Sequence, residues 1–185
     1  RLLELMRSAG FDQIDCTPDT ASPSIIRNMK KNFTYEELVR CADIIRKVGM
    51  PTIWFFMFGG PGETEETVLD NFRFIDEYMD PQDMAYLVEG IRILPHTALR
   101  EKAIEEGVIR ETDSLYEPVF YISPTIERNS LALLLRKESR KRNHVIHGLQ
   151  GTPLPWMIEK AVRMREEEKL KEPMFRTLLR IRDEF

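Results

Sequence analysis

The 185-residue sequence has only two cysteines, Cys16 and Cys41, separated by 24 residues. Two cysteines cannot build a disulfide framework, which excludes a small disulfide-stabilised secreted domain. Cys16 falls in an expected strand, and Cys41 falls on the apolar stripe of an expected helix. We therefore predict that both are buried small hydrophobic side chains in a reducing, cytoplasmic protein.

Long apolar runs and excess positive charge are also missing. No stretch of about 18 consecutive apolar residues exists, so we expect no membrane-spanning helix. The formal net charge of −4 argues against nucleic acid as the main partner. His144 and His147 would share a helix face, but no third ligand has a suitable spacing, so no metal site is predicted.

What the first half does contain is an alternation of apolar runs and amphipathic segments. Apolar runs at 11–16, 52–58 and 84–93 predict strands, and the intervening helices begin and end at recognisable capping residues. This order predicts an α/β fold with about three parallel strands in consecutive order and helices on one face. Three strands do not close a barrel, so we expect a partial (β/α) barrel with open edges.

The second half shows no strand pattern after Val119–Tyr121. Helices are predicted to begin near Ser123, near Pro153 or Pro155, and near Pro173. We therefore predict a partial barrel over residues 1–110 and an all-helical accessory module over 111–185, with the boundary near 110–122.

The most informative segment is 56–67, which reads FMFGGPGETEET. An apolar strand ends abruptly at Gly59-Gly60-Pro61-Gly62, and an acidic helix start follows at Glu63. Such loops lie at the carboxyl ends of parallel strands, where ligands bind. A plain structural turn is the alternative interpretation.

Three neighbouring segments extend this pattern. Residues 14–22 read IDCTPDTAS, residues 29–34 read MKKNFT, and residues 90–99 read GIRILPHTAL. In this order and spacing, they resemble the second half of the core of the radical S-adenosylmethionine (radical SAM) superfamily. The resemblance covers roughly residues 1–125, and GPGET is its most specific part. GIRILP is similar to a strand of the subgroup that often carries a cobalamin-binding domain.

The sequence departs from that family in one respect. The family holds a [4Fe–4S] cluster with three closely spaced cysteines, and this sequence has no such motif. It also starts inside a helical pattern without an initiator Met. We therefore expect a carboxyl-terminal fragment of a larger enzyme, not catalytically competent alone, whose partner is the missing amino-terminal half of the same polypeptide.

The resemblance implies residues for the SAM pocket. Asp19 and Thr20 stand where the family has a Glu-Ser pair beside the ribose and amino-acid parts of SAM. The loop of Gly59, Gly60, Pro61, Gly62 and Glu63 resembles the adenine-side loop. The alternative for Asp19 and Thr20 is a local turn, because such side chains often bond their own backbone.

Two further residues are predicted on the substrate side. Arg92 interrupts an apolar run, and its guanidinium could hold a carboxylate of a ligand. The alternative is an internal ion pair with Glu89 or Asp15. His96 replaces the Gly of the family's P-G-T turn, where a larger side chain would narrow the substrate side.

The leading functional hypothesis is part of a radical SAM enzyme, with S-adenosylmethionine and [4Fe–4S] as the parent's cofactors and cobalamin as a possible addition. The resemblance implies 5′-deoxyadenosyl-radical chemistry or cobalamin-assisted methyl transfer on an unknown small molecule. The alternative is a non-catalytic half-barrel that serves in assembly. Its open sheet edges would then allow self-association.

Overall fold

The computed structural model describes residues 1–148 and 155–182. Its centre is a parallel four-stranded sheet in the order β1-β2-β3-β6. The strands are β1 (Ile14–Asp19), β2 (Thr52–Phe58), β3 (Met84–Glu89) and β6 (Val145–His147). The predicted α/β class, the parallel pairing and the consecutive order of the first three strands are confirmed.

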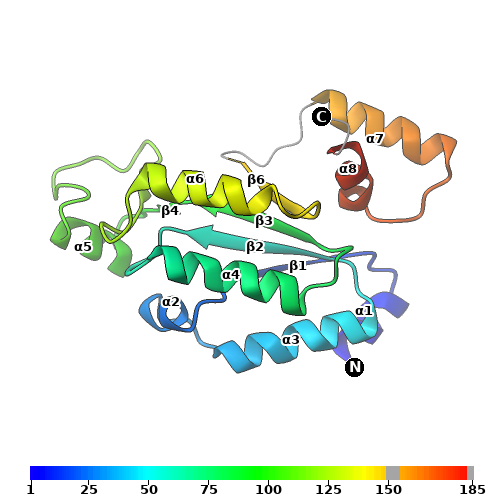
Figure 1. Cartoon of the computed structure of the whole chain (residues 1–185), viewed down its shortest axis with the longest axis horizontal. Helices are drawn as coiled ribbons and strands as arrows, with labels where there is room; N and C mark the ends of the chain where they lie inside the picture. The colour runs from blue at the N-terminus through cyan, green and yellow to red at the C-terminus, as the bar shows by residue number, and fades with distance from the viewer. Residues whose placement is uncertain (149–154, 183–185) are drawn as a thin grey trace.

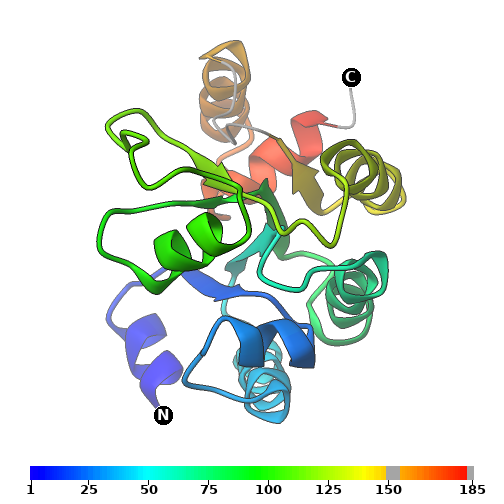
Figure 2. The ribbon, with the colours of Figure 1, turned by 90° about the vertical axis from the view of Figure 1, so that its left-hand side faces the viewer.

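Helices cover mainly one face of this sheet. Figure 2 shows α3, α4 and α6 side by side along that face. The helices are α1 (Leu2–Ser8), α2 (Pro23–Asn28), α3 (Tyr35–Val48), α4 (Glu65–Tyr78), α5 (Ala98–Glu105), α6 (Arg128–Ser139), α7 (Pro155–Glu167) and α8 (Met174–Arg182). One apolar core joins α3, α4 and α6 to the sheet.

The helix boundaries follow from local sequence. At the start of α3, the Thr34 hydroxyl accepts a hydrogen bond from the Glu37 N–H, and the Glu37 carboxylate accepts one from the Thr34 N–H. This reciprocal cap satisfies two donors that the first helical turn leaves unpaired. The helix ends at Gly49, whose φ of 66° suits a residue without a Cβ.

Buried and partly buried side chains alternate along β2, because successive residues of a strand point to opposite faces of the sheet. Trp54, Phe56 and Phe58 are at most 1% exposed and contact the aromatic rings of α4. Fully burying a side chain of this size contributes about 2–3 kcal/mol. Phe55 points to the opposite face, where its ring lies 5.4 Å from that of Tyr86 on β3. The helix-covered face therefore carries the core, and the other face carries partly exposed apolar side chains.

The run 84–93 is not one strand. Gly90 has a φ of 79° and separates β3 from β4 (Ile91–Arg92). A Cβ at this position would lie 2.9 Å from Phe120 Cβ. β4 pairs antiparallel with β5 (Phe120–Tyr121), and Figure 1 shows α5 beyond the arrowheads of the central strands. The chain thus builds a small second layer at the carboxyl ends of the strands.

The second half differs from the all-helical expectation at β6, which adds a fourth parallel strand beside β3. Its Val145 is fully buried in the same core cluster as Leu131 and Leu135 of α6. Three residues are too short for a recognisable period of two, so the pairing with β3 specifies this strand. The predicted division at residue 110 stays a prediction.

The amino-terminal end of the sheet is fastened by Asp83, whose side chain is 3% exposed. Its carboxylate accepts from the Thr52 N–H at 2.9 Å and the Trp54 indole N–H at 3.3 Å. Burial raises the pKa of Asp83 to about 6, against the lowering effect of these two bonds. Arg176 of α8 lies 3.8 Å from the same carboxylate, so α8 packs at this end.

The structure also bears on two sequence predictions, the absence of a membrane-spanning helix and the burial of the two cysteines. Within residues 1–148 and 155–182, no helix is long and apolar enough to cross a membrane. Cys16 is partly buried, but Cys41 is exposed, so the predicted burial of Cys41 is wrong. Cys41 lies at the margin of the apolar stripe of α3, between the buried Leu38 and Ala42, where one side of the helix already faces solvent.

Candidate functional site

The predicted site residues gather at the carboxyl edge of the sheet. Asp19 ends β1, the Gly59–Glu63 loop follows β2, and Arg92 and His96 come after β3. Because the strands are parallel, these segments meet at one edge, the end toward which the arrows point in Figure 1. We call this end of the molecule the carboxyl edge.

The Gly59–Glu63 loop folds around its own carboxylate. Glu63 is fully buried and accepts from the Gly59 N–H at 3.1 Å and the Gly60 N–H at 3.3 Å. The Thr67 hydroxyl donates to its other oxygen at 2.5 Å. Burial raises the pKa of Glu63, and these hydrogen bonds oppose the increase. Glu63 therefore holds the loop from inside.

Other segments occupy most of the remaining polar groups of the loop. Ser123 accepts from the Gly62 N–H at 3.1 Å through its hydroxyl, and its own N–H donates to the Gly59 carbonyl at 2.9 Å. The side-chain amide of Asn28 donates to the Pro61 carbonyl at 2.8 Å. Hence the backbone of this loop is used mainly to bind other parts of the protein.

The glycines of the loop are required by the same close packing. A Cβ on Gly59, whose φ is 93°, would lie 3.0 Å from Ile122 Cγ1. A Cβ on Gly62, whose φ is 79°, would lie 2.7 Å from the Asn28 amide nitrogen. These are contacts with the protein itself, which agrees with the structural turn that the sequence left as an alternative.

Asp19 and Thr20 point in different directions. Asp19 has a φ of 67°, and its Oδ2 accepts from Lys31 Nζ in a pair that is about one-fifth exposed. Thr20 is fully buried; its hydroxyl accepts from the Ser22 N–H at 3.1 Å and donates to Asn71 Oδ1 at 3.3 Å. Asp19 thus stays near the surface of the edge, and Thr20 forms the local turn considered as its alternative.

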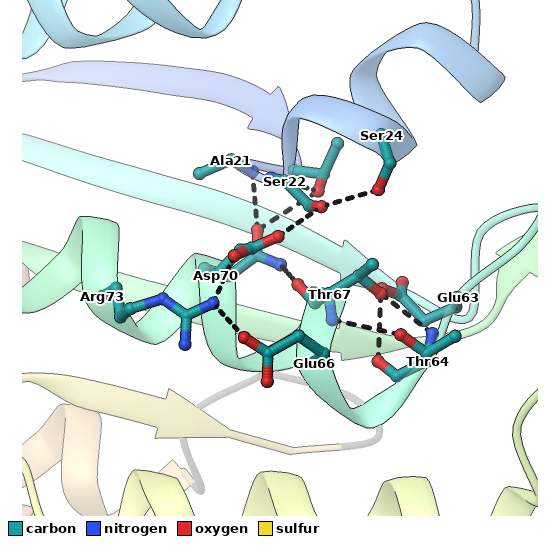
Figure 3. Close-up of polar contacts among 11 residues, drawn as sticks. Ala21, Ser22, Ser24, Glu63, Thr64, Glu66, Thr67, Asp70 and Arg73 are labelled. Atoms are coloured by element: carbon teal, nitrogen blue, oxygen red, sulfur yellow. Dashed lines mark hydrogen bonds and ion pairs between the residues drawn. The ribbon is translucent and has the colours of Figure 1, made fainter.

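Asn71 of α4 connects the two predicted cofactor segments. Its Oδ1 accepts from the Ala21 N–H at 2.6 Å, and its Nδ2 donates to the Thr67 carbonyl at 2.9 Å. Thr67 in turn reaches Glu63, so a continuous chain of hydrogen bonds joins the segment after β1 to the loop after β2 (Figure 3). A buried Asn connects the two candidate segments.

The sequence analysis missed Asn71, although a signal was present. Asn71 is 1% exposed and stands on the buried stripe of α4 beside Val68 and Phe72. A polar residue on such a stripe must find partners, because burying an unpaired amide costs about 1–3 kcal/mol. Its neighbour Asp70 accepts from the Ser22 hydroxyl at 2.6 Å on the outer side (Figure 3).

Arg92 and His96 lie on the open side of the edge. Both are exposed, and Glu89, which the sequence offered as a partner of Arg92, is paired with His147. His96 adopts a φ of 59° just before Thr97, whose hydroxyl caps α5. Glycine adopts this left-handed conformation without steric cost, so His96 occupies a backbone position that favours glycine.

The Glu89–His147 pair was also missed. His147 Nε2 lies 2.6 Å from Glu89 Oε1, and both side chains are about one-tenth exposed. Both side chains point to the same face of the sheet as Leu87 of β3 and Val145 of β6, which belong to the core shared with the helices. Because β6 was not expected, the sequence could not bring these residues together, and the pair links the neighbouring strands β3 and β6.

Sequence comparison identifies one family. The model of the radical SAM superfamily matches residues 1–75, which include β1, α3 and β2 with its glycine loop. A comparison with curated proteins gave no match.

Structure comparison identifies larger proteins with the same fold. The radical S-adenosylmethionine methyltransferase TsrM from Kitasatospora setae, with cobalamin and a [4Fe-4S] cluster bound, is 16% identical with a TM-score of 0.60 over 95% of this chain. The same enzyme with tryptophan substrate and a SAM analog bound is 16% identical, with a TM-score of 0.65 over 98% of this chain. Elp3 from the archaeon Methanocaldococcus infernus is 15% identical, with a TM-score of 0.54 over 91% of this chain. This chain covers 41%, 43% and 39% of those chains.

Proposed function

Because the chain belongs to the radical SAM superfamily, we propose that its carboxyl edge forms part of the S-adenosylmethionine pocket and the substrate chamber of a radical SAM enzyme. The observation that carries this proposal is the hydrogen-bond chain through Asn71. It fixes the segment after β1 relative to the loop after β2, and these are the two segments that the family resemblance assigns to SAM.

Asp19 is the residue best suited to direct contact. Its carboxylate stands at the edge, and Lys31 engages one of its oxygens, Oδ2. A carboxylate oxygen can accept from ribose hydroxyls, which are donors. Thr20 has the different role of a positioning residue, because its hydroxyl is turned inward to Asn71 and Ser22.

The glycine loop serves as an apolar wall rather than a set of hydrogen-bond donors. Its N–H groups at Gly59, Gly60 and Gly62 already have protein acceptors. The side-chain direction of Gly60 is filled by the protein, where a Cβ would lie 3.1 Å from Ile25 Cγ2, whereas Pro61 is partly exposed. We therefore assign Pro61 to the adenine side through van der Waals contact, with the buried Gly60 and Glu63 as its internal support.

Residues of this chain do not fit the iron–sulfur cluster itself. Such clusters take closely spaced thiolates from a loop, whereas Cys16 is on β1 and Cys41 is on α3. SAM and its cluster supply a 5′-deoxyadenosyl radical in this superfamily. What this chain contributes is orientation: Asp19 holds hydroxyl groups, the loop excludes water from one side, and the helix layer keeps both rigid.

On the substrate side we propose Arg92 and His96. Arg92 is exposed on β4 at the same edge and can place a guanidinium against an anionic group. His96 stands in the turn before α5 and narrows the entrance. TsrM, one of the similar structures, binds cobalamin, which supports cobalamin-assisted methyl transfer as the reaction class.

The test uses the polypeptide that carries this chain, reconstituted anaerobically with iron and sulfide. SAM affinity and the formation of 5′-deoxyadenosine and S-adenosylhomocysteine are measured for the wild type, Asp19→Asn and Asp12→Asn. Asp12 is exposed and precedes β1, so it is the matched control. We expect Asp19→Asn to weaken SAM binding about tenfold, the cost of about 1.4 kcal/mol for a lost charged hydrogen bond.

Three results would contradict the proposal. They are equal SAM affinity in Asp19→Asn and wild type, an equal loss in Asp12→Asn, and formation of neither 5′-deoxyadenosine nor S-adenosylhomocysteine by the reconstituted wild type. The last result would favour the alternative of a non-catalytic half-barrel that serves in assembly.

We also propose that the sheet edges are completed by further strands. β1 and β6 are the outer strands of the sheet, and their outward N–H and C=O groups suit pairing with another strand. The partner that fits best is the remaining half of the barrel. Size-exclusion chromatography of this chain with lysines introduced on β1 measures whether edge pairing otherwise drives self-association.

A further inference from the structure

A carboxylate and an imidazole end two neighbouring strands of the sheet. Glu89 is the last residue of β3 and His147 is the last residue of β6, and Glu89 Oε1 lies 2.6 Å from His147 Nε2. The two residues form a diagonal pair, because the strand register sets His147 opposite Leu87. In (β/α) barrels, catalytic residues come from the carboxyl ends of several strands. The pair therefore stands where such a fold places its chemistry.

The contact decides which ring nitrogen of His147 carries a proton. An ionised carboxylate can only accept hydrogen bonds, so in a neutral imidazole Nε2 donates to Glu89. Nδ1 is then unprotonated and has a lone pair. A histidine that a carboxylate holds in one tautomer in this way is the arrangement by which general bases are oriented.

Nδ1 is the open side of this pair. Within residues 1–148 and 155–182, Nδ1 makes no hydrogen bond, and it does not belong to the buried atoms without one. It is therefore accessible to solvent, although only 13% of the His147 side chain and 10% of the Glu89 side chain are exposed. A link that only fastened β6 to β3 would not need an accessible nitrogen. A metal site is not indicated, since no group of three or more potential ligands comes together in the described part of the chain.

We propose that Glu89 and His147 form a proton-accepting site at the carboxyl edge. His147 is the catalytic residue, whose Nδ1 removes a proton from an N–H or O–H group of a small-molecule substrate. Glu89 is a positioning residue, because it acts through the imidazole. The role in turnover rests on the proposed function, but the basicity of Nδ1 depends only on β3 and β6.

The proton transfer is complete without a further reagent. The N–H or O–H bond of the substrate breaks, its electron pair stays on the substrate atom, and the proton binds Nδ1. The imidazolium then donates from both nitrogens, and the Glu89 carboxylate offsets its charge. Solvent later takes the proton from Nδ1, so the pair returns to its starting state and no electrons are exchanged with a redox partner.

The experiment uses the polypeptide that carries this chain, without SAM, iron or sulfide. It is treated with limiting diethyl pyrocarbonate at about pH 8, where a free imidazole is unprotonated. Carbethoxylated histidines are located by peptide mass mapping, with the exposed His96 as the internal reference. We expect His147 to react at a rate within about threefold of that of His96, because an unprotonated and accessible ring nitrogen is the reacting form.

Two matched pairs of variants assign the roles. Glu89→Gln should favour the tautomer with a proton on Nδ1 and slow the modification of His147 about tenfold, whereas Glu101→Gln at an exposed position of α5 should not change it. With thiols blocked by iodoacetamide, His147→Gln should lower the hydrolysis of p-nitrophenyl acetate about threefold, and His144→Gln, at the other end of β6, should leave it unchanged. Circular dichroism checks that the variants are folded.

Each of three results overturns the proposal. One is protection of wild-type His147 by about tenfold or more relative to His96, because an enclosed ring reacts only when the structure opens locally. The others are equal rates of His147 modification in Glu89→Gln and Glu101→Gln, and equal ester hydrolysis by His147→Gln and wild type. The wild-type map decides even if a variant does not fold. None of these results bears on SAM binding, so the SAM pocket and this site are tested separately.

Discussion

Two loops at the carboxyl edge carry the residues that the sequence singled out, and they are built in opposite ways. The Gly59–Glu63 loop is closed: its polar groups bond to Glu63, Ser123 and Asn28, and its glycines touch other side chains. The segment from Arg92 to His96 is open: apart from the buried Ile93 its side chains are exposed, and it ends in a strained turn. Sequence motifs alone do not distinguish a loop that braces a site from one that presents groups to a ligand.

The largest expected effect is on the closed loop. Gly59→Ala should lower the free energy of unfolding by about 2–4 kcal/mol, because it adds a crowded Cβ to a left-handed backbone. The matched control is Gly107→Ala: Gly107 has a φ of 71°, but a Cβ there has no neighbour within 4 Å. It should cost only about 1 kcal/mol. Urea unfolding measures both, and equal losses would show that packing around Gly59 is unimportant.

The next effect concerns pH and the two buried carboxylates. Burial raises the pKa of Glu63 and of Asp83, the latter to about 6. An acid whose pKa is higher in the folded state favours folding while protonated. Stability should therefore be greatest below about pH 4 with respect to these groups, and fall by about 2–3 kcal/mol for Asp83 as the pH rises through about 6.

Two variants separate these contributions. Asp83→Asn should remove the decrease in stability between about pH 4 and about pH 6. Glu63→Gln should remove the decrease due to Glu63 and cost about 1–3 kcal/mol at low pH through mismatched hydrogen bonds. Urea unfolding between pH 4 and 8 is the measurement. A decrease of unchanged size in both variants would contradict the assignment.

His96→Gly tests the open loop, and the expected sign is reversed. Glycine relieves the left-handed conformation, so stability should rise by about 0.5–1 kcal/mol. If His96 narrows the substrate entrance, turnover should fall although the protein becomes more stable. Thermal melting with activity assays tests both, and a loss of stability would show that the His96 side chain makes a favourable contact.

The smallest effect on stability is expected for Arg92→Lys, within about 0.5 kcal/mol, because the side chain is exposed. The substitution keeps the charge and removes the bidentate donor geometry. Turnover of the reconstituted enzyme should fall, whereas Arg136→Lys on the exposed side of α6 should change neither quantity. Full activity of Arg92→Lys would end its assignment to the substrate side.

The sequence predicted most of the fold because period and capping residues carry that information locally. The bounds of β2 agree with the prediction, and α3 begins after a capping residue, Thr34, as was expected for the helices between the strands. β6 was missed because three residues have no period of their own. The break at Gly90 was missed because an apolar run does not reveal a left-handed residue within it.

The candidate site was predictable only in part. The order and direction of the strands could be predicted from sequence, so Asp19 and the glycine loop were placed at the correct edge, although β1 runs to Asp19 instead of ending at residue 16. The directions of side chains were not predictable: Glu63 and Thr20 turn inward because Gly60 and Asn71 offer them partners there. The partner of Glu89 is His147, 58 positions further along the chain, and only tertiary pairing reveals it.

The bond between the Ala21 N–H and Asn71 Oδ1 makes one backbone amide a native reporter of local opening. Its proton can exchange with deuterium only when the segment after β1 separates from α4. In native-state exchange experiments, the protection of this amide therefore measures the free energy that holds the two loops together. A ligand that bridges both loops should slow that exchange, and a ligand that contacts only Arg92 or His96 should leave it unchanged. One resonance would thus distinguish the two sides of the carboxyl edge without any mutation.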